Sequence, residues 1–305
     1  MAVGRARTNG ECEGPRSSAD RQSPPVCLRR ALDTQHLAAA VPWDRSVVLG
    51  SFWPNSSASF ESSLIKTLKE CYPAGDYQPH ISGLCRFYAQ IALRAVEGER
   101  FDWAARVLSS AERERDPARP MSLIVDRLCA LTGARDVTDV FFKAETRPPM
   151  RSIDRLAGPD ALAARLDYVI QDLFVRPRPL GGTVMLVDDI CNVGASMRVY
   201  AHALRVFAGV ERVVCVNLAA TRFNRGRDGR GMLKLDTSAL AGERAFGEVW
   251  TDAGGVLHLD RTCPAAVGRP VCGPRFAAER RASACTVCAR AERPRRLFSL
   301  WESRG

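Results

Sequence analysis

The chain has 305 residues, of which 46% are hydrophobic, and a formal net charge of +10. This length allows one large or two modest domains with a real core, and no apolar run reaches the roughly 18 residues that a membrane span needs. The charge is concentrated at the ends: residues 1–30 hold six arginines against three acids, and residues 257–305 hold ten arginines against four acids. The body of the chain between them is nearly neutral.

The amino-terminal segment and the cysteines bear on the compartment. Residues 1–35 are rich in Arg, Ser, Gly and Pro and show no hydrophobic periodicity, so we expect a disordered tail there. The segment lacks the apolar stretch of a secretory signal. We therefore expect a cytoplasmic protein without a membrane partner, whose 11 cysteines are reduced thiols.

Strand-like and helix-like segments alternate along residues 36–250. The predicted order is strand 46–54, helix 56–72, helix 83–98, strand 101–110, helix 117–133, strand 136–143, helix 159–174, strand 183–187, helix 195–208 and strand 211–222. Gly133 ends the third helix, and the fourth is open to a change into a strand near Tyr168. This alternation predicts an α/β domain with a parallel sheet flanked by helices.

The stretch VMLVDDICNVGASM, residues 184–197, carries the clearest chemistry. Asp188 and Asp189 follow four apolar residues of a predicted buried strand, and ligands of parallel sheets bind beyond such strand ends. The predicted loop 188–194 runs straight into a helix, so its backbone N–H groups can hold an anion. Gly194 lets the backbone approach a ligand closely, and Ser196 can cap the helix and donate to a phosphate oxygen.

The two halves of this stretch suit different parts of one ligand. Carboxylates would repel a phosphate, but they suit vicinal hydroxyls or a magnesium ion a few ångströms further along. A sugar phosphate satisfies both halves. The alternative interpretation is purely structural: an Asx turn at the end of a strand, followed by a helix cap.

The same stretch resembles the signature of type I phosphoribosyltransferases, and the layout of residues 45–225 is similar to the subgroup related to the competence protein ComF. The resemblance implies that Asp188 and Asp189 hold the ribose hydroxyls at the catalytic centre. It also implies that the 5′-phosphate loop consists of Asn192, Val193, Gly194, Ala195 and Ser196. The family has threonines where this chain has Asn192 and Val193, and the Val193 side chain cannot donate a hydrogen bond.

Two outer segments resemble the family in order and character. Residues 106–120 correspond to the loop that contacts pyrophosphate, and residues 141–156 correspond to a basic hood segment. Within the hood, Lys143, Arg147 and Arg151 are the candidates for pyrophosphate contact. The alternative is a basic segment that simply faces solvent.

The resemblance implies a glycosyltransferase that binds phosphoribosyl diphosphate with Mg²⁺ and transfers the phosphoribosyl group to an unknown small-molecule acceptor, with release of pyrophosphate. It also allows a homodimer. Because of the departures at Asn192 and Val193, a sensor or regulator that binds the ligand without turnover is the alternative.

The carboxyl-terminal segment contains a separate motif. His258 and Cys263 are followed 22 residues later by the pair Cys285 and Cys288, and three thiolates with one imidazole fit a tetrahedral, structural Zn²⁺ site. Cys272 is the alternative to His258 as fourth ligand, and four unrelated side chains are the bland alternative. The spacing resembles the zinc-binding part of Ada-type DNA-repair proteins. We expect a module at 256–292 and a tail at 293–305.

The arginines around this motif raise a third function class, nucleic-acid binding. Phe276 is the only aromatic residue between the expected zinc ligands, whereas proteins that bind single strands usually supply several aromatic rings for stacking. We therefore expect nucleic acid to bind weakly or not at all.

Overall fold

A computed structural model of the protein describes residues 23–54, 58–70, 78–150, 153, 161–222, 235–240 and 243–290. Arg151 and the rest of the hood segment at 152 and 154–156, the first 22 residues of the predicted tail 1–35, and the tail predicted at 293–305 lie outside these residues. Among the described helices, none is long and apolar enough to cross a membrane.

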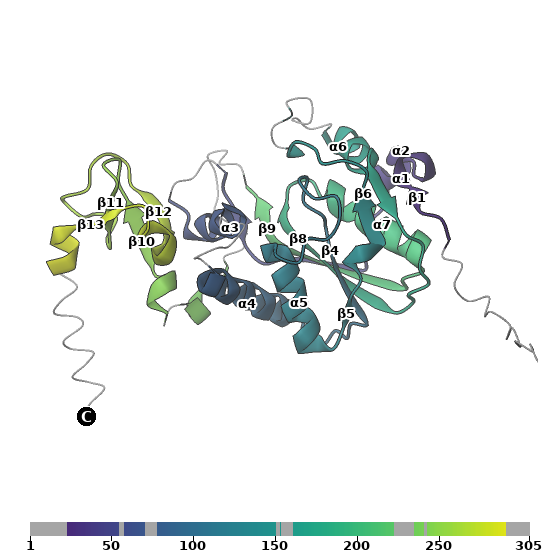
Figure 1. Ribbon diagram of the computed structural model, residues 1–305, viewed down its shortest axis with the longest axis horizontal. Helices are drawn as coiled ribbons and strands as arrows, with labels where there is room; N and C mark the ends of the chain where they lie inside the picture. The colour runs from purple at the N-terminus through teal and green to yellow at the C-terminus, as the bar shows by residue number, and fades with distance from the viewer. Residues whose placement is uncertain are drawn as a thin grey trace, which may run out of the picture.

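A six-stranded sheet forms the centre of the molecule (Figure 1). Its strand order is β2 (Arg45–Val48), β9 (Arg212–Thr221), β8 (Thr183–Cys191), β4 (Trp103–Arg106) and β5 (Arg135–Asp136), and β3 (Ser51–Phe52) also pairs with β9. Every described pairing in this sheet is parallel. The predicted α/β fold with a parallel sheet is therefore confirmed.

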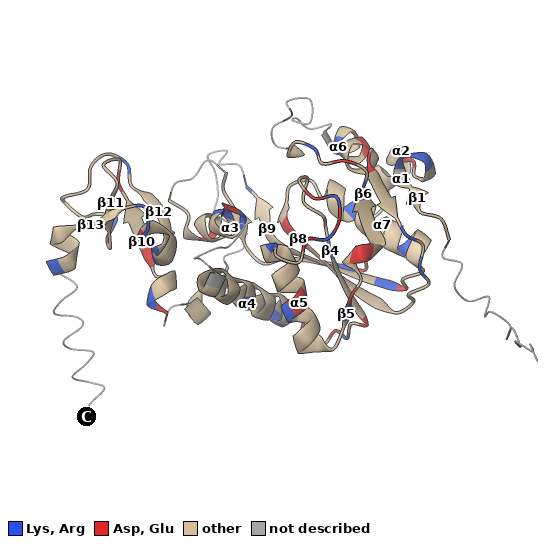
Figure 2. Ribbon diagram, viewed as in Figure 1, with Lys and Arg blue, Asp and Glu red and all other residues tan. Residues whose placement is uncertain are grey.

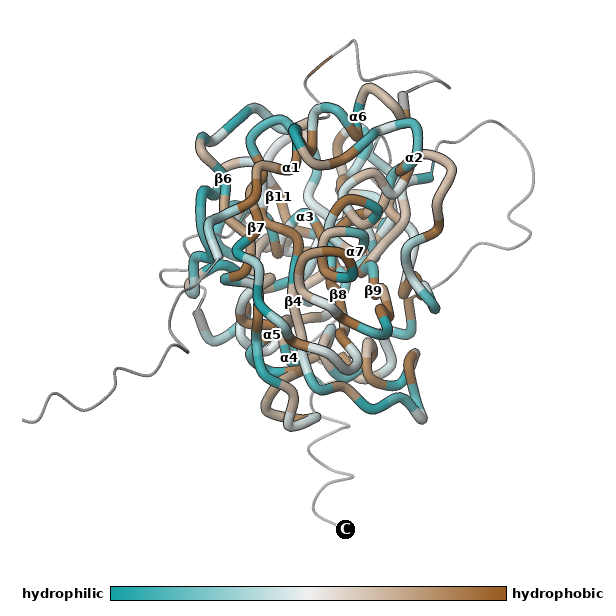
Figure 3. Tube along the Cα trace, turned by 90° about the vertical axis from the view of Figure 1, so that its right-hand side faces the viewer, coloured by the Kyte–Doolittle hydropathy of each residue, from teal (hydrophilic) through white to brown (hydrophobic). Residues whose placement is uncertain are grey.

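Helices cover both faces of this sheet. One face packs against α3 (Phe60–Glu70), α4 (Gln78–Ala95) and α5 (Pro120–Thr132), and the other against α2 (Thr34–Ala39), α6 (Ala161–Ile170) and α7 (Ala195–Ala208). The side chains of β8 alternate accordingly, with Met185 and Val187 in the first core and Val184 and Leu186 in the second. Figure 3 shows the hydrophobic colouring of β8 and β9 inside the molecule.

Several helix ends have local causes. The predicted helix 83–98 begins earlier, at Gln78, and its second residue is Pro79, a residue that suits a first helical turn. Gly133 ends α5 as predicted, in the left-handed conformation with φ +79°. The segment 159–174 does change to strand, but only after Ile170, as β7 (Leu173–Val175).

A second, three-stranded antiparallel sheet corrects the predicted strand 136–143. It joins β1 (Val26–Cys27), β7 and β6 (Phe141–Lys143). The predicted strand 136–143 is split by the 3-10 helix η3 (Thr138–Val140), so its second half leaves the central sheet.

The tail predicted at 1–35 is wrong for its last ten residues. The chain is ordered there in β1 and the short helix α1 (Leu28–Ala31), and α2 begins at Thr34. Leu28 and, within α2, Leu37 are buried in the second core. These two leucines anchor the segment to the body. Two isolated apolar residues do not produce a hydrophobic periodicity, so the sequence did not indicate a helix here.

The carboxyl-terminal module is a small four-stranded sheet beside α3 (Figure 1). Its order is β12 (Val271–Pro274), β10 (Glu248–Thr251), β11 (Val256–His258) and β13 (Ser283–Ala284), with the short helix α8 (Arg275–Ala278) after β12. The module therefore begins at β10, and not at residue 256 as expected. Two 3-10 helices, η6 (Ser238–Leu240) and η7 (Arg244–Phe246), precede it.

Aromatic rings join the module to the body. Phe276 stacks on His80 of α4 with 4.8 Å between ring centroids, and Phe246 meets Phe276 edge to face at 5.6 Å. A Cβ at Gly83 would lie 2.9 Å from Cζ of Phe246, so any larger residue would push this ring out of its place. The module and the body therefore share one hydrophobic core.

Candidate functional site

Asp188 and Asp189 lie near the carboxyl end of β8, but the strand is longer than predicted. It continues to Cys191, because β9 pairs with it up to Ala220. The expected loop 188–194 is therefore shortened to the last few residues. By strand alternation, Asp188 lies on the face covered by α7, and Asp189 lies on the opposite face.

Asp189 has a cationic partner. Its Oδ2 lies 2.6 Å from Nζ of Lys69, at the end of α3, and its Oδ1 accepts the N–H of Ile190 at 2.6 Å. Any ligand hydroxyl that binds this carboxylate must share it with Lys69 or displace the lysine.

Asp188 lies in a less favourable environment for a charge. Burial, and then the negative charge of Asp189, raise the pKa of Asp188 above its ordinary value, against the opposing charge of Lys69. Asn217 lies directly beside it in register on β9, and its buried Oδ1 has no hydrogen-bond partner among the described residues. A ligand hydroxyl could donate a hydrogen bond to a carboxylate oxygen of Asp188 or to Oδ1 of Asn217.

The expected phosphate loop ends in a backbone conformation that suits an anion site. Gly194 is the N-cap of α7 with φ +75°, a value that favours glycine, and no side chain caps the helix. The prediction that Ser196 caps α7 is wrong, because Ser196 is already the second helical residue. The N–H groups of the first turn, at Ala195 and Ser196, remain available to an anion.

Arg165 of α6 adds a positive charge to this loop that the sequence did not reveal. With the amide of Asn192 oriented so that its oxygen faces α6, that oxygen accepts from Nη1 of Arg165 at 2.8 Å and from Nη2 at 3.3 Å. Asn192 and Val193 are exposed, so both lie at the protein surface beside the guanidinium.

A buried lysine binds the backbone of the loop that follows β4. Nζ of Lys143 donates to the backbone oxygen of Ser109 at 2.5 Å and to that of Leu108 at 3.4 Å. Burial lowers the pKa of Lys143 to about 8. Lys143 therefore fixes the loop that we expected to contact pyrophosphate, and it does not belong to a segment facing solvent.

A buried ion pair holds the same loop from the side. The guanidinium of Arg106 binds Glu112 through two hydrogen bonds, of 2.9 and 2.5 Å, and both side chains are almost fully buried. Glu112 also accepts the N–H of Ser109 at 2.6 Å. On the α7 side, the N–H of Leu108 donates to the hydroxyl of Tyr200 at 3.2 Å. The backbone of this loop is thus fixed at the successive residues Leu108 and Ser109. Figure 2 shows that acidic and basic residues lie close together around β4 and β8.

The second predicted hood residue, Arg147, makes internal contacts. Its Nη1 lies 3.2 Å from Oδ1 of Asp172, and its guanidinium covers the ring of Tyr168 at 4.5 Å. Its N–H donates to the backbone oxygen of Ser110 at 3.0 Å. Arg147 therefore ties the hood to the loop after β4.

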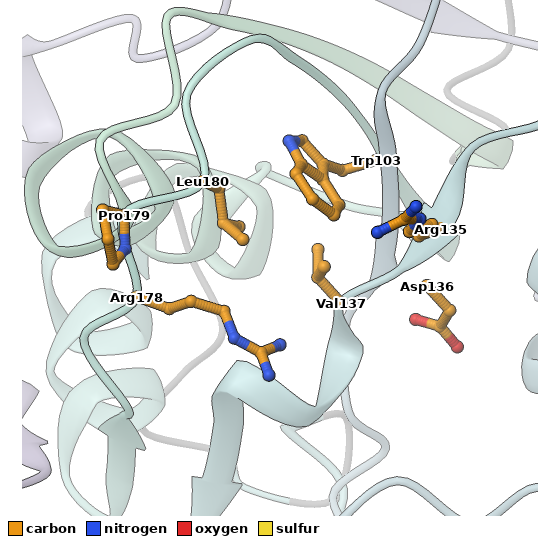
Figure 4. A pocket seen from close by; sticks show the side chains of 7 residues that line it. All are labelled: Trp103, Arg135, Asp136, Val137, Arg178, Pro179 and Leu180. Carbon is orange, nitrogen blue, oxygen red and sulfur yellow. The ribbon is translucent and has the colours of Figure 1, made fainter. Parts of the chain in front are cut away.

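Two cavities lie away from the carboxyl end of β8. One, of about 410 Å³, opens at the amino ends of β4 and β5, and its lining includes Trp103, Arg135 and Arg178 (Figure 4). The other, of about 690 Å³, lies between the α1–α2 segment and α6, beside Asp33 and Tyr168. Ligands of parallel sheets bind at the carboxyl edge, so we do not take either cavity as the sugar-phosphate site.

The module contains a candidate metal centre that contains the four predicted ligands. One potential ligand atom from each of His258, Cys263, Cys285 and Cys288 lies within 4.8 Å of the others, and all four side chains are buried. Sγ of Cys263 lies 3.9 Å from Sγ of Cys285. Four protein ligands leave no open position, which is typical of structural metal sites.

Cys272 is not part of this cluster. Its thiol donates to Oε1 of Glu248 at 3.1 Å, and burial raises its pKa beyond the usual range. The alternative in which Cys272 replaces His258 is therefore not supported by the geometry. In contrast, backbone N–H groups of Cys288 and Val287 lower the pKa of Cys285 to about 7, which favours the thiolate that a metal requires.

Comparisons with known proteins add no relative. No family model, no curated protein and no solved structure matches the chain. The functional argument therefore rests on the geometry of the chain itself.

Proposed function

We propose that the chain binds phosphoribosyl diphosphate at the carboxyl edge of its central sheet and transfers the phosphoribosyl group to a small-molecule acceptor. The observation that carries this proposal is the order along β8 and α7: two carboxylates at a strand end, then Gly194 with φ +75° opening a helix that no side chain caps. Sugar hydroxyls and a phosphate are the two groups that such an order can bind together.

Each part of the site has a role in this proposal. The first turn of α7 and Arg165 receive the 5′-phosphate, and Asp188 and Asp189 accept the ribose hydroxyls. The loop at Leu108–Ser110, fixed by Lys143 and Glu112, faces the diphosphate. Such fixed backbone groups lose little freedom when a ligand binds, so they position it efficiently.

Magnesium would accompany the diphosphate. Carboxylate oxygens are ligands that Mg²⁺ accepts, so Asp188 and Asp189 fit a cation as well as hydroxyls, and the ion would neutralise the leaving pyrophosphate. In the transfer, the bond from C1 of the ribose to the pyrophosphate oxygen breaks, and the acceptor forms the new bond to C1. The chain would need no covalent intermediate, because its work is to orient both molecules and to exclude water.

A second candidate, a sensor that binds the ligand without turnover, is favoured by one observation. Lys69 forms an ion pair with Asp189 at 2.6 Å, and Arg147, a predicted pyrophosphate contact, forms an ion pair with Asp172. Transfer requires these cations to change partners, whereas binding of the 5′-phosphate does not. Release of pyrophosphate distinguishes the two candidates.

We do not favour nucleic-acid binding by the module. Two of its arginines have partners within it: Arg261 lies over the ring of Trp250 at 5.5 Å, and Nε of Arg275 pairs with Glu279 at 2.6 Å. An electrophoretic shift that persists at physiological salt, and that is lost when the module is removed, would reverse this preference.

For the module we propose Zn²⁺ as the bound ion. Three thiolates and one imidazole, all buried and closed around one point, are the donor set that zinc prefers for structural sites. Elemental analysis of protein purified without chelators is expected to find one zinc ion per chain, and its absence would refute this part.

Calorimetry tests the sugar site. Phosphoribosyl diphosphate with Mg²⁺ should bind the wild-type chain, and Asp189→Asn should weaken binding by about 1–3 kcal/mol through loss of a charge-assisted hydrogen bond. Asp126→Asn, which changes an exposed partner of Arg115, is the matched control and should bind normally. No heat of binding by the wild-type chain would refute the proposal.

A further inference from the structure

The two ring nitrogens of His258 differ in their hydrogen bonding. Nε2 lies 3.1 Å from Oδ2 of Asp252, while Nδ1 is buried and has no hydrogen-bond partner among the described residues. The ring is fully buried, so Nδ1 does not reach solvent to form a hydrogen bond with bulk water. Native structures rarely leave a buried ring nitrogen without a partner.

Asp252 can only accept hydrogen bonds in this arrangement. Its Oδ1 accepts the N–H groups of Gly254 and Val256, each at 2.9 Å, and its Oδ2 accepts the N–H of Val267 at 3.0 Å. A carboxylate that already accepts three backbone donors is held as an acceptor for the fourth group as well. The proton of the neutral imidazole therefore resides on Nε2, and Nδ1 carries the free lone pair.

We propose that the metal binds Nδ1 of His258, and that Asp252 is a positioning residue that fixes the ring through the hydrogen bond from Nε2. This inference rests on the metal centre and is independent of the proposed phosphoribosyl site. A ligand histidine commonly donates its second ring N–H to a carboxylate, which sets both its orientation and its tautomer.

Asp252 also connects the segments that supply the ligands. Its contacts to Gly254 and Val256 shape the turn that leads into β11 and His258, and its contact to Val267 holds the chain shortly after Cys263. The segment that carries Cys285 and Cys288 is connected to β11 through the backbone, since the N–H of Cys285 donates to the backbone oxygen of Leu257 at 2.9 Å. One carboxylate therefore aligns two of the three segments that carry the proposed ligands.

Nitrogen-15 NMR of the full chain, labelled at histidine and loaded with Zn²⁺, tests the assignment directly. We expect the coordination shift on Nδ1 of His258 and an attached proton on Nε2. Coordination through Nε2 would overturn the inference while leaving the zinc proposal intact. Absence of bound zinc would refute the metal centre itself.

Metal affinity gives a second test. In a chelator competition with Zn²⁺, Asp252→Asn should lower the affinity of the full chain by about 10–100-fold, because an amide can donate to Nε2 and shift the proton to Nδ1. Asp260→Asn is the matched control: Asp260 is an exposed acid of the same module that accepts from Thr262, and the variant should keep wild-type affinity. Equal affinities for Asp252→Asn and Asp260→Asn would overturn the positioning role.

Discussion

The sheet-edge site and the metal centre differ in how their polar groups are satisfied. At the sheet edge, Asp189 pairs with Lys69, Arg147 pairs with Asp172, and Lys143 binds backbone carbonyls. In the candidate metal centre, three thiols and the imidazole of His258 lie close together, and Nδ1 of His258 has no hydrogen-bond partner among the described residues. To bind a ligand, the first site must exchange partners at Lys69 and Arg147, whereas the second offers four ligand atoms to a cation without such an exchange.

This difference predicts different costs of damage. At the sheet edge the cations are paired within the protein and only Oδ1 of Asn217 lacks a partner among the groups described above, so the fold of the body should not depend on phosphoribosyl diphosphate. A centre of buried thiolates around a cation depends on that cation, because folding and metal binding share one free energy.

The largest expected effect is the loss of the metal. Cys285→Ala removes a thiolate at the centre, so the chain should lose its zinc and most of the roughly 10–16 kcal/mol of binding free energy that such sites supply. Elemental analysis should find almost no zinc, and hydrogen exchange should show loss of protection at 248–290 while the central sheet stays protected.

Cys272→Ala is the matched control for that change. Cys272 is also a buried cysteine of the module, but its thiol binds Glu248 and lies outside the cluster. It should keep a full complement of zinc. If both variants lost zinc equally, the contrast between the two cysteines would be wrong.

Sequence spacing predicted which side chains form the cluster because cysteines and histidines are rare and their chemistry is specific. All four predicted side chains meet, and the spacing alone could not exclude Cys272. Asp252 was missed because acidic residues are common in any chain. Only the folded turn shows that this one reaches His258.

The sheet was predictable in class but not in detail. Alternating strands and helices predicted the parallel sheet, yet the extension of β8 to Cys191 depends on pairing with β9, which is a long-range contact. Asn217 and Arg165 lie on other elements than the motif, so no local signal connects them to Asp188 or Asn192. Lys143 was a candidate ligand because burial cannot be read from a lone lysine.

The second prediction concerns the scaffold under the sheet-edge site. Glu112→Gln leaves the buried guanidinium of Arg106 without its counter-charge, which should destabilise the chain by about 3–5 kcal/mol. Chemical denaturation measures the change. Glu114→Gln, in the same loop, removes an exposed partner of Arg176 and should cost no more than about 1 kcal/mol. Similar losses in both variants would show that the loop is not held by the buried pair.

The third prediction separates conformation from ligand binding at the two ends of α7. Gly194 and Gly209 both have positive φ, +75° and +62°, so alanine at either should cost about 1–2 kcal/mol of stability. Only Gly194→Ala should also weaken binding of phosphoribosyl diphosphate in calorimetry, because only Gly194 lies at the N-terminus of the helix. Normal binding by Gly194→Ala would argue against a phosphate site there.

The last prediction concerns Asp188 in the ligand-free chain, where the change of stability with pH has an informative sign. The pKa of Asp188 is raised in the folded chain, so between the ordinary value of about 4 and the raised value the folded state holds a proton that the unfolded state releases. The stability that this group contributes therefore falls as pH increases through that window. Asp188→Asn cannot ionise, so it should gain thermal stability over the wild type at about pH 9 but not at about pH 5.

The same substitution should weaken ligand binding, because the amide lacks the charge that a ribose hydroxyl would meet. A variant that is more stable at high pH yet binds less tightly would mean that Asp188 is maintained at a cost to the fold, as functional groups at strand ends often are. If Asp188→Asn lowered stability at both pH values, the carboxylate would instead be a structural acceptor, and the contrast drawn between the two sites would need to be reversed at this residue.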